Sequence, residues 1–266
     1  MAKWLVAGLA LAQLASPMFA ADPVAVPPGM SDATCPAPVA GQFALDEHLL
    51  KTDWAWLCRF RADNALVDPA HPPHVVFIGD SITENWLSSD PDFFAHGNLD
   101  RGISGQTSPQ LLVRFYQDVV ALHPAVVHIM VGTNDIAGNT GPTNPEAYMN
   151  AVRAMVDLAR ANHIAVILGS IPPTVSFGWQ PAVSPGPWVA RLNQWLRDYA
   201  AEQHLVFADY HSALAGPAGE LPAEFGPDGV HPNAAGYAVM RGVAERAIAE
   251  ADAQANHRHS HRNQHD

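Results

Sequence analysis

The chain has 266 residues, of which 48% are hydrophobic and 15% are charged, and its formal net charge at neutral pH is −12. The composition is that of a globular protein, and the length fits one α/β domain of about 200 residues with appendages. Because no cluster of Lys and Arg residues offsets the acidic charge, the composition argues against nucleic acid or anionic lipid as a partner.

The first 20 residues have the pattern of a signal peptide. Lys3 gives a short positive start, residues 4–15 form a mostly apolar core, and residues 17–20 end in a small residue where cleavage could occur. A membrane anchor is the alternative, but the apolar run is too short to span a bilayer comfortably, and no later segment is long enough. We therefore expect an exported protein, periplasmic or secreted, that does not insert stably in a membrane.

The next segment, residues 21–43, is rich in Pro, Ala and Gly and predicts an extended lead-in. It contains Cys35, and the only other cysteine of the chain is Cys58. In an oxidising compartment the two could form a disulfide that contributes about 3 kcal/mol and ties the lead-in to the first helix. The alternative is two unpaired thiols, one of them buried. The spacing does not suit zinc.

Residues 45–60 have an amphipathic helical pattern, and a group of prolines then breaks the chain. Apolar strands and helical patterns alternate after that. The expected strands are 74–79, a weaker one near 98–103, 126–132, 164–170 and 205–209. The clearest helical patterns lie at 148–159, 189–199 and 237–248. Strands that are apolar on both faces predict a parallel sheet covered by helices on each side, within one domain of residues 44–252.

The last segment, residues 253–266, is expected to be a disordered tail. Its last ten residues contain four histidines and two arginines without apolar periodicity. Imidazoles ligate transition metals, so weak metal binding is the alternative to a purely solvated tail.

Polar residues follow three of the expected strands, and parallel α/β sheets place their sites at the carboxyl ends of strands. Gly79-Asp80-Ser81 follows the first strand, where a helix begins and its free backbone N–H groups favour negative charge. Ser81 is thus a candidate nucleophile. The alternative is that Ser81 only caps the helix, with Glu84 completing a capping box.

A second motif, Asp228-Gly229-Val230-His231, lies just before the last helix. The spacing lets one short loop carry both side chains, so the Asp228 carboxylate could orient the His231 imidazole as a general base for a serine. Pro232 disfavours helical geometry at His231 and keeps it in the loop. A surface His–Asp pair without catalytic function is the alternative.

Acyl transfer also needs preset hydrogen-bond donors for an oxyanion. Gly105, after the second strand, could present its backbone N–H, and Asn134, after the third strand, could present its side-chain amide. The backbone N–H of Ser81 could be a third donor. Alone, Gly105 would be read as a tight turn and Asn134 as a turn or helix cap.

The four blocks together resemble the SGNH (GDSL) hydrolases, especially bacterial members similar to the catalytic subunits of platelet-activating-factor acetylhydrolase. The blocks are Gly79-Asp80-Ser81-Ile82, Gly102 to Thr107, Gly132 to Asp135 and Asp228 to Pro232, and they occur in the family's order between about residues 74 and 250. The resemblance implies a flavodoxin-like three-layer α/β/α sandwich with a five-stranded parallel sheet. It also implies a catalytic triad of Ser81, His231 and Asp228, an oxyanion hole from Ser81, Gly105 and Asn134, and no metal or cofactor.

The sequence departs from the family pattern at two positions, and it does not contain the motifs of rival classes. Ile82 replaces Leu, and Asp100 precedes Arg101-Gly102 where relatives often carry Asn, which leaves the local hydrogen bonding of that strand open. The α/β-hydrolase elbow G-x-S-x-G is not formed, because Gln106 occupies its last glycine position. Neither a zinc-protease motif nor a phosphate-binding glycine loop is present in the sequence.

The segment from Ile171 to Trp188 follows the fourth strand and should border the same end of the sheet. Trp179 and Trp188 could stack on a sugar ring or wall an acyl pocket, or could only pack this loop against the body. We expect a small-molecule or carbohydrate ester with a short acyl group as substrate, and acetyl esters are the first choice. A lysophospholipase or thioesterase is the main rival, and a catalytically silent binding module on the same fold is a third possibility.

Overall fold

The computed structural model describes residue 35, residues 46–141 and residues 143–262 of the chain. The expected signal peptide, residues 1–20, lies outside the described residues, as does the expected lead-in, residues 21–43, apart from Cys35. The helices and strands that the structure describes all belong to the unit formed by residues 38–266.

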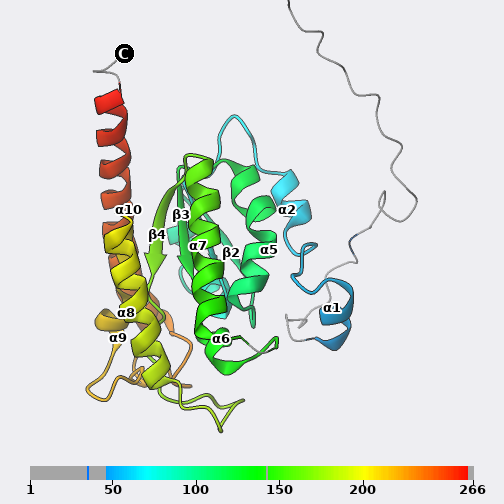
Figure 1. Ribbon diagram of the computed structural model, residues 1–266, viewed down its shortest axis with the longest axis vertical. Helices are drawn as coiled ribbons and strands as arrows, with labels where there is room; N and C mark the ends of the chain where they lie inside the picture. Colours follow the sequence, from blue (N-terminus) through cyan, green and yellow to red (C-terminus); the bar gives the residue numbers. More distant parts are fainter. Residues whose placement is uncertain (1–34, 36–45, 142, 263–266) are drawn as a thin grey trace, which may run out of the picture. The chain divides into compact units, whose positions relative to one another are not determined.

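A five-stranded parallel sheet forms the centre of this unit (Figure 1). Its strands are β1 (Val75–Gly79), β2 (Asn98–Gly102), β3 (Val126–Met130), β4 (Ala165–Gly169) and β5 (Val206–Ala208). Their order across the sheet is β2-β1-β3-β4-β5, and every neighbouring pair is parallel. This is the flavodoxin-like order, which places a crevice for a ligand near the point where the connections change direction, at the carboxyl ends of β1 and β3.

Helices connect the strands and cover both faces of the sheet. They are α1 (Glu47–Thr52), α2 (Arg61–Ala65), α3 (Ser81–Ser89), α4 (Pro91–Phe94), α5 (Ser108–Asp118), α6 (Thr133–Ala137), α7 (Pro145–Ala161), α8 (Gly186–Glu202), α9 (Tyr210–Leu214) and α10 (Ala234–Arg262), with a 3₁₀ turn at Val120–Leu122. None of the helices in the described part of the chain combines the length and the apolar character that crossing a membrane requires.

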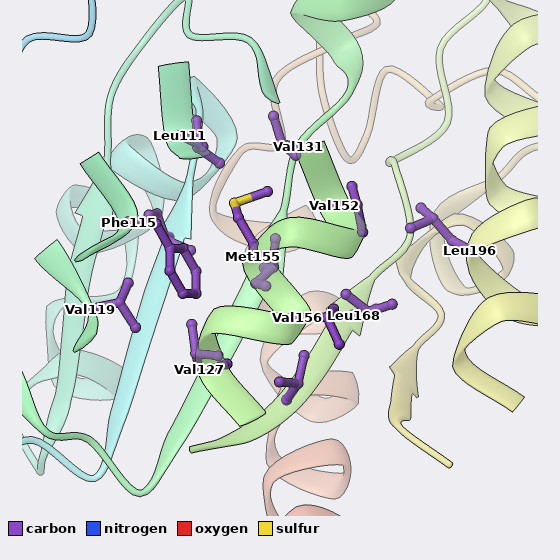
Figure 2. Packing of buried hydrophobic residues seen from close by; sticks show 14 of the residues in the cluster. Leu111, Phe115, Val119, Val127, Val131, Val152, Met155, Val156, Leu168 and Leu196 are labelled. Atoms are coloured by element: carbon purple, nitrogen blue, oxygen red, sulfur yellow. The ribbon is translucent and has the colours of Figure 1, made fainter. Parts of the chain in front are cut away.

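The alternation of strand side chains sorts the core into two layers. Val76 and Ile78 of β1 belong to a cluster with α5, α7 and α8, whereas Val75 and Phe77 belong to a second cluster with α3, α4, α9 and α10. Figure 2 shows the first cluster, with Met155 of α7 among the side chains that cover the sheet. The expected three-layer α/β/α sandwich is therefore confirmed, because each face of the parallel sheet is buried under helices.

The expected helix over residues 45–60 is wrong in its extent. Within this region the structure forms α1, which ends at Thr52, and turns then follow until α2 begins at Arg61. The break occurs at Asp53, whose carboxylate accepts hydrogen bonds from the backbone N–H groups of Leu57 (2.7 Å) and Cys58 (2.9 Å). Trp56 adopts the left-handed conformation, with a φ of 53°, which is incompatible with a continuing helix.

The tail also differs from the expectation of disorder from residue 253. Helix α10 continues through that position to Arg262. The segment that follows the buried Ala251 contains Ala253 and Ala255 and no Gly or Pro, so helix propensity favours continuation. Helix α10 therefore covers residues 253–262 of the expected tail, and residues 263–266 lie outside the described part.

Both cysteines, Cys35 and Cys58, are disulfide-bonded, and no free cysteine occurs among the described residues. The interpretation of two unpaired thiols is thereby excluded. Disulfides persist in oxidising compartments, so this bond is compatible with an exported protein.

Candidate active site

Ser81 is the first residue of α3 and directly follows the carboxyl end of β1. The helix is capped by Asp80, whose side chain accepts a hydrogen bond from the backbone N–H of Ile82 (3.0 Å). Ser81 therefore does not serve as the cap, and the capping-box interpretation with Glu84 is wrong. The Glu84 carboxylate instead accepts hydrogen bonds from the backbone N–H (2.7 Å) and from the hydroxyl of Ser104, which lies in the turn after β2.

The hydroxyl of Ser81 and the imidazole of His231 lie in direct contact. Ser81 Oγ is 2.9 Å from His231 Nε2, although the two residues are far apart in the sequence. On the other side of the ring, His231 Nδ1 is 2.7 Å from Asp228 Oδ2. An ionised carboxylate can only accept, so Nδ1 carries the proton and the Nε2 lone pair faces the serine hydroxyl. This tautomer is the one that can remove a proton from Ser81.

Asp228 is fixed by its own loop. Its Oδ1 atom accepts hydrogen bonds from the backbone N–H groups of Val230 (2.9 Å) and His231 (2.8 Å). Partial burial alone would raise the pKa of Asp228, but the hydrogen bonds from His231 and Val230 outweigh it and lower the pKa. The carboxylate is therefore ionised over the neutral range, and its charge favours a cationic imidazole when one forms.

The turn after β2 and the start of α6 meet beside Ser81. Gly105 has a φ of 85°, in the left-handed region that favours glycine. The buried side chain of Asn134 donates from Nδ2 to the backbone carbonyl of Gln106 (3.1 Å) and to Asp80 Oδ2 (3.2 Å). Burial raises the pKa of Asp80 to about 6, although the hydrogen bond from Ile82, the nearby His231 and the hydrogen bond from Asn134 oppose the shift. Asn134 thus connects the segments that follow β1, β2 and β3.

The structure separates the two tryptophans that the sequence singled out. The ring centre of Trp179 lies 6.5 Å from that of His231, and its indole stacks on Phe177 at 4.8 Å. Trp188 of α8 stacks with Arg191. Together with Tyr148 and other residues it lines a cavity of about 250 Å³, and neither Ser81 nor His231 is among the residues that line this cavity. Of the two tryptophans, Trp179 is therefore the one that lies beside His231.

Two buried groups support the site and were not predicted from the sequence. Arg114 donates to the carbonyl of Gly79 (3.0 Å), to Gln106 Oε1 (2.6 Å) and to Asp118 Oδ2 (3.2 Å). A sequence signal exists, because Arg114 falls on the apolar stripe of α5, between Leu111 and Phe115, where a charge needs a buried partner.

The second supporting group is Asp135, which follows Asn134. Its carboxylate accepts hydrogen bonds from the backbone N–H (3.0 Å) and hydroxyl (2.6 Å) of Ser108, the first residue of α5. Burial raises the pKa of Asp135 to about 6, although the bonds from Ser108 oppose this shift. The contact fixes α6 against the start of α5, and thus holds Asn134 in place.

A larger cavity, of about 580 Å³, lies away from this site, at the amino edge of the sheet beside His163 and His204. Ligands of open parallel sheets bind at the opposite, carboxyl edge, so the surroundings of Ser81, and not this cavity, are the candidate active site. Among the described residues, no group of three or more His, Cys, Asp or Glu side chains is arranged to hold a metal ion.

The five-stranded flavodoxin-like sheet thus carries a serine hydroxyl, an imidazole and a carboxylate in hydrogen-bonded series, an arrangement typical of serine hydrolases. The sequence model of the GDSL-like lipase/acylhydrolase family matches residues 77–239 of the chain. The chain belongs to this family and is a carboxylic ester hydrolase.

Solved structures show the same relationship. An acylhydrolase from Bacteroides fragilis is 43% identical, with a TM-score of 0.71, over 74% of this chain and 98% of the other. A GDSL-like lipase from Bacteroides thetaiotaomicron is 38% identical, with the same coverage of both chains and the same TM-score. An acetylxylan esterase from Geobacillus stearothermophilus is 22% identical over 65% of this chain and 93% of its own, with a TM-score of 0.55, and shares the fold. No functionally curated protein matches the sequence.

Proposed function

We propose that the chain is an exported serine esterase that hydrolyses short-chain acyl esters, acetyl esters first, on a carbohydrate or another small polar alcohol. Ser81 is the nucleophile, His231 the general base and then acid, and Asp228 the residue that orients His231. The observation that carries the proposal is the contact of 2.9 Å between Ser81 Oγ and His231 Nε2, with Asp228 on the far side of the ring.

In the first half-reaction, Ser81 Oγ attacks the ester carbonyl carbon while His231 Nε2 takes the hydroxyl proton. The carbonyl oxygen becomes an oxyanion, for which the backbone N–H groups of Ser81 and Gly105 and the amide of Asn134 are the proposed donors. When the intermediate collapses, the bond to the alcohol breaks and His231 gives its proton to the leaving oxygen. The acyl group then remains on Ser81.

In the second half-reaction, a water molecule gives a proton to His231 and attacks the acyl carbon. The second oxyanion collapses, the bond to Ser81 breaks, and the serine oxygen recovers its proton from His231. The carboxylic acid is released and the free enzyme is restored. None of these steps uses a metal ion or a cofactor.

The surroundings of Ser81 favour a short acyl group and a polar alcohol. The buried polar groups next to the nucleophile are Asp80, Asn134 and the backbone carbonyl of Gln106, and Asn139 connects Asn134 to Trp179. A long alkyl chain needs an apolar channel to recover its hydrophobic free energy, about 0.8 kcal/mol for each buried CH₂ group. The exposed indole face of Trp179 suits the apolar face of a sugar ring.

The test is the hydrolysis of nitrophenyl acetate by the wild type and by Ser81→Ala, with labelling by a fluorophosphonate probe. We expect the wild type to turn over the ester and to be labelled at Ser81, and we expect Ser81→Ala to lose both properties while it remains folded. A Ser81→Ala variant that retains turnover would contradict the assignment of Ser81 as the nucleophile. A wild type that is neither active nor labelled would favour a silent binding module.

A lysophospholipase or thioesterase that acts on longer chains is the second candidate function. A series of nitrophenyl esters distinguishes the two: peak kcat/KM at two to four carbons supports the proposal, and a peak at eight or more supports the alternative. A screen of acetylated polysaccharides for released acetate would then identify the alcohol. Export is proposed from the pattern of residues 1–20, and the disulfide-bonded state of Cys58 is consistent with it.

A further inference from the structure

A chain of hydrogen bonds leads from the exposed indole of Trp179 to the amide of Asn134. Trp179 Nε1 donates to Asn139 Oδ1 over 3.1 Å, and Asn139 Nδ2 donates to Asn134 Oδ1 over 2.6 Å. Trp179 lies on the loop between β4 and α8, and Asn139 lies just beyond α6. The first member of the chain is 42% exposed, whereas the last, Asn134, is 3% exposed.

Each bond in this chain has only one possible direction. An indole N–H group can donate but cannot accept, so Asn139 must turn its carbonyl oxygen toward Trp179. Its NH₂ group then faces Asn134, which must present its own carbonyl oxygen in return. The only orientation left for Asn134 directs both hydrogens of Nδ2 away from Asn139. The indole, acting through Asn139, therefore favours one orientation of the Asn134 amide, with its NH₂ group turned away from Asn139.

The groups on the far side of Asn134 agree with this orientation. Nδ2 of Asn134 donates to the carbonyl oxygen of Gln106 (3.1 Å), in the turn that contains Gly105, and to Asp80 Oδ2 (3.2 Å), beside Ser81. Both bonds are at the long end of the usual range. One of these hydrogens can therefore pass to an oxyanion at Ser81 with little loss, provided that the amide is already turned the right way.

We propose that Asn139 and Trp179 are positioning residues that set the orientation of the Asn134 amide, so that its N–H groups face the oxyanion. This inference rests on the proposed function, because it assigns a purpose to the donor that the proposed mechanism uses. Neither residue needs to touch the reacting atoms. The rotation of Trp179 is itself fixed, because its indole stacks on the buried Phe177 at 4.8 Å.

The variant that tests the proposal most directly is Trp179→Phe, which keeps an aromatic ring but removes the N–H donor. With nitrophenyl acetate we expect kcat to fall by about 3- to 10-fold, because part of the Asn134 population turns its oxygen toward the oxyanion. KM should stay within about twofold of the wild-type value, since the ground-state ester gains little from the oxyanion donor. Trp54→Phe, at another exposed tryptophan, is the matched control and should change neither parameter.

Variants of Asn139 test the second bond. Asn139→Leu removes the link, and we expect kcat to fall by about 10- to 100-fold with KM nearly unchanged. Asn139→Asp still accepts from Trp179, but its carboxylate can only accept, so the Asn134 amide must turn its NH₂ group toward Asp instead of toward Ser81. Asn139→Asp should thus be at least as impaired as Asn139→Leu. Asn150→Leu, at an exposed asparagine of α7, is the control.

The outcomes separate the two proposals. Values of kcat for Trp179→Phe and Asn139→Leu within twofold of the wild type, with Ser81→Ala inactive, would overturn the positioning role and leave the esterase assignment intact. An active Ser81→Ala would instead overturn the esterase assignment. A rise in KM with kcat unchanged in Trp179→Phe would also count against positioning, because it would show a contact with the ground-state ester. If Asn139→Leu fails to fold, the surface variant Trp179→Phe decides.

Discussion

Asp228 holds His231 at two points at once: Oδ2 lies 2.7 Å from the ring atom Nδ1, and Oδ1 accepts the backbone N–H of the same residue over 2.8 Å. The short loop between the two residues makes this double contact possible, because the side chain reaches its own loop backbone and the imidazole together. The geometry fixes both the position of the ring and its tautomer.

Replacing Asp228 with Asn tests the role of that tautomer. The amide can still accept the backbone N–H through its oxygen, but its NH₂ group then faces Nδ1 and forces the proton to Nε2. An imidazole in this form cannot take the proton of Ser81. We expect kcat for nitrophenyl acetate to fall by about 10³- to 10⁴-fold, the scale of such changes in serine hydrolases, with the melting temperature changed little.

The control for this prediction is Asp92→Asn, at an exposed carboxylate of α4. It removes the same charge from the chain and should leave kcat at the wild-type value. If Asp228→Asn kept more than a tenth of wild-type kcat, the orienting role of Asp228 would have to be abandoned.

The backbone conformation of Gly105 gives a second prediction. With a φ of 85°, the residue lies where a Cβ atom costs about 1 kcal/mol. Gly105→Ala should lower the free energy of unfolding by about that amount, and it should also lower kcat, because relaxation of the turn moves the proposed N–H donor. Gly219→Ala provides the comparison, since Gly219 has a φ of 79°, open space around it and no contact with the site.

Measured by urea denaturation and by initial rates, the two glycine variants should lose similar stability, but only Gly105→Ala should lose activity. Equal activity in both variants would show that the turn after β2 contributes no donor.

Most of the fold could be predicted from the sequence because its strands are short, apolar on both faces and separated by clear helical patterns. The expected strand at 126–132, for example, is β3 at Val126–Met130, and the pattern at 148–159 lies within α7. Local pattern was insufficient near residues 45–60, where the Asp53 carboxylate accepts backbone N–H groups and ends the helix despite its apolar face.

For the residues of the site, too, local sequence motifs could be recognised, whereas contacts in space could not. Ser81, Asn134 and the Asp228–His231 loop could be proposed because each stands in a recognisable motif after a strand or before a helix. Asn139 could not, because its importance depends on which groups surround it in space, and nothing in its sequence neighbourhood indicates Trp179 as a partner. Arg114 is intermediate, since its position on an apolar stripe indicates burial but not the identity of its partners.

Arg114 gives a third prediction, about stability. It is fully buried with Asp118, and it joins the end of β1 to the turn after β2 through Gly79 and Gln106. Arg114→Met leaves the Asp118 carboxylate without its cation, and loss of one partner of a buried pair costs about 3–5 kcal/mol. We expect a loss of that size in urea denaturation.

The double variant Arg114→Met with Asp118→Asn distinguishes the cost of the unpaired charge from the cost of the lost hydrogen bonds. It should recover part of the stability, because the remaining partner is then neutral. No recovery would mean that the bonds to Gly79 and Gln106, and not the ion pair, carry the effect.

The last prediction concerns Asp100 of β2. Its Oδ1 atom accepts the backbone N–H of Gly102 over 2.9 Å, but its buried Oδ2 atom has no hydrogen-bond partner. Burial raises the pKa of this carboxyl group from 3.8 to about 7, although the bond from Gly102 opposes the shift. The folded protein therefore holds Asp100 in its neutral form in mildly acidic solution.

A raised carboxyl pKa means that the folded state binds the proton more tightly than the unfolded chain does. The stability that the neutral form provides is thus complete below about pH 4 and is lost as the pH rises through about 7. Asp100→Asn keeps a neutral side chain of the same shape at every pH. Relative to the wild type, the free energy of unfolding of Asp100→Asn should therefore increase between pH 4 and pH 8, as measured by urea denaturation at each pH. Because Asp80 and Asp135 titrate in both proteins, the difference between them isolates Asp100, and a difference that stays constant with pH would refute its burial in neutral form.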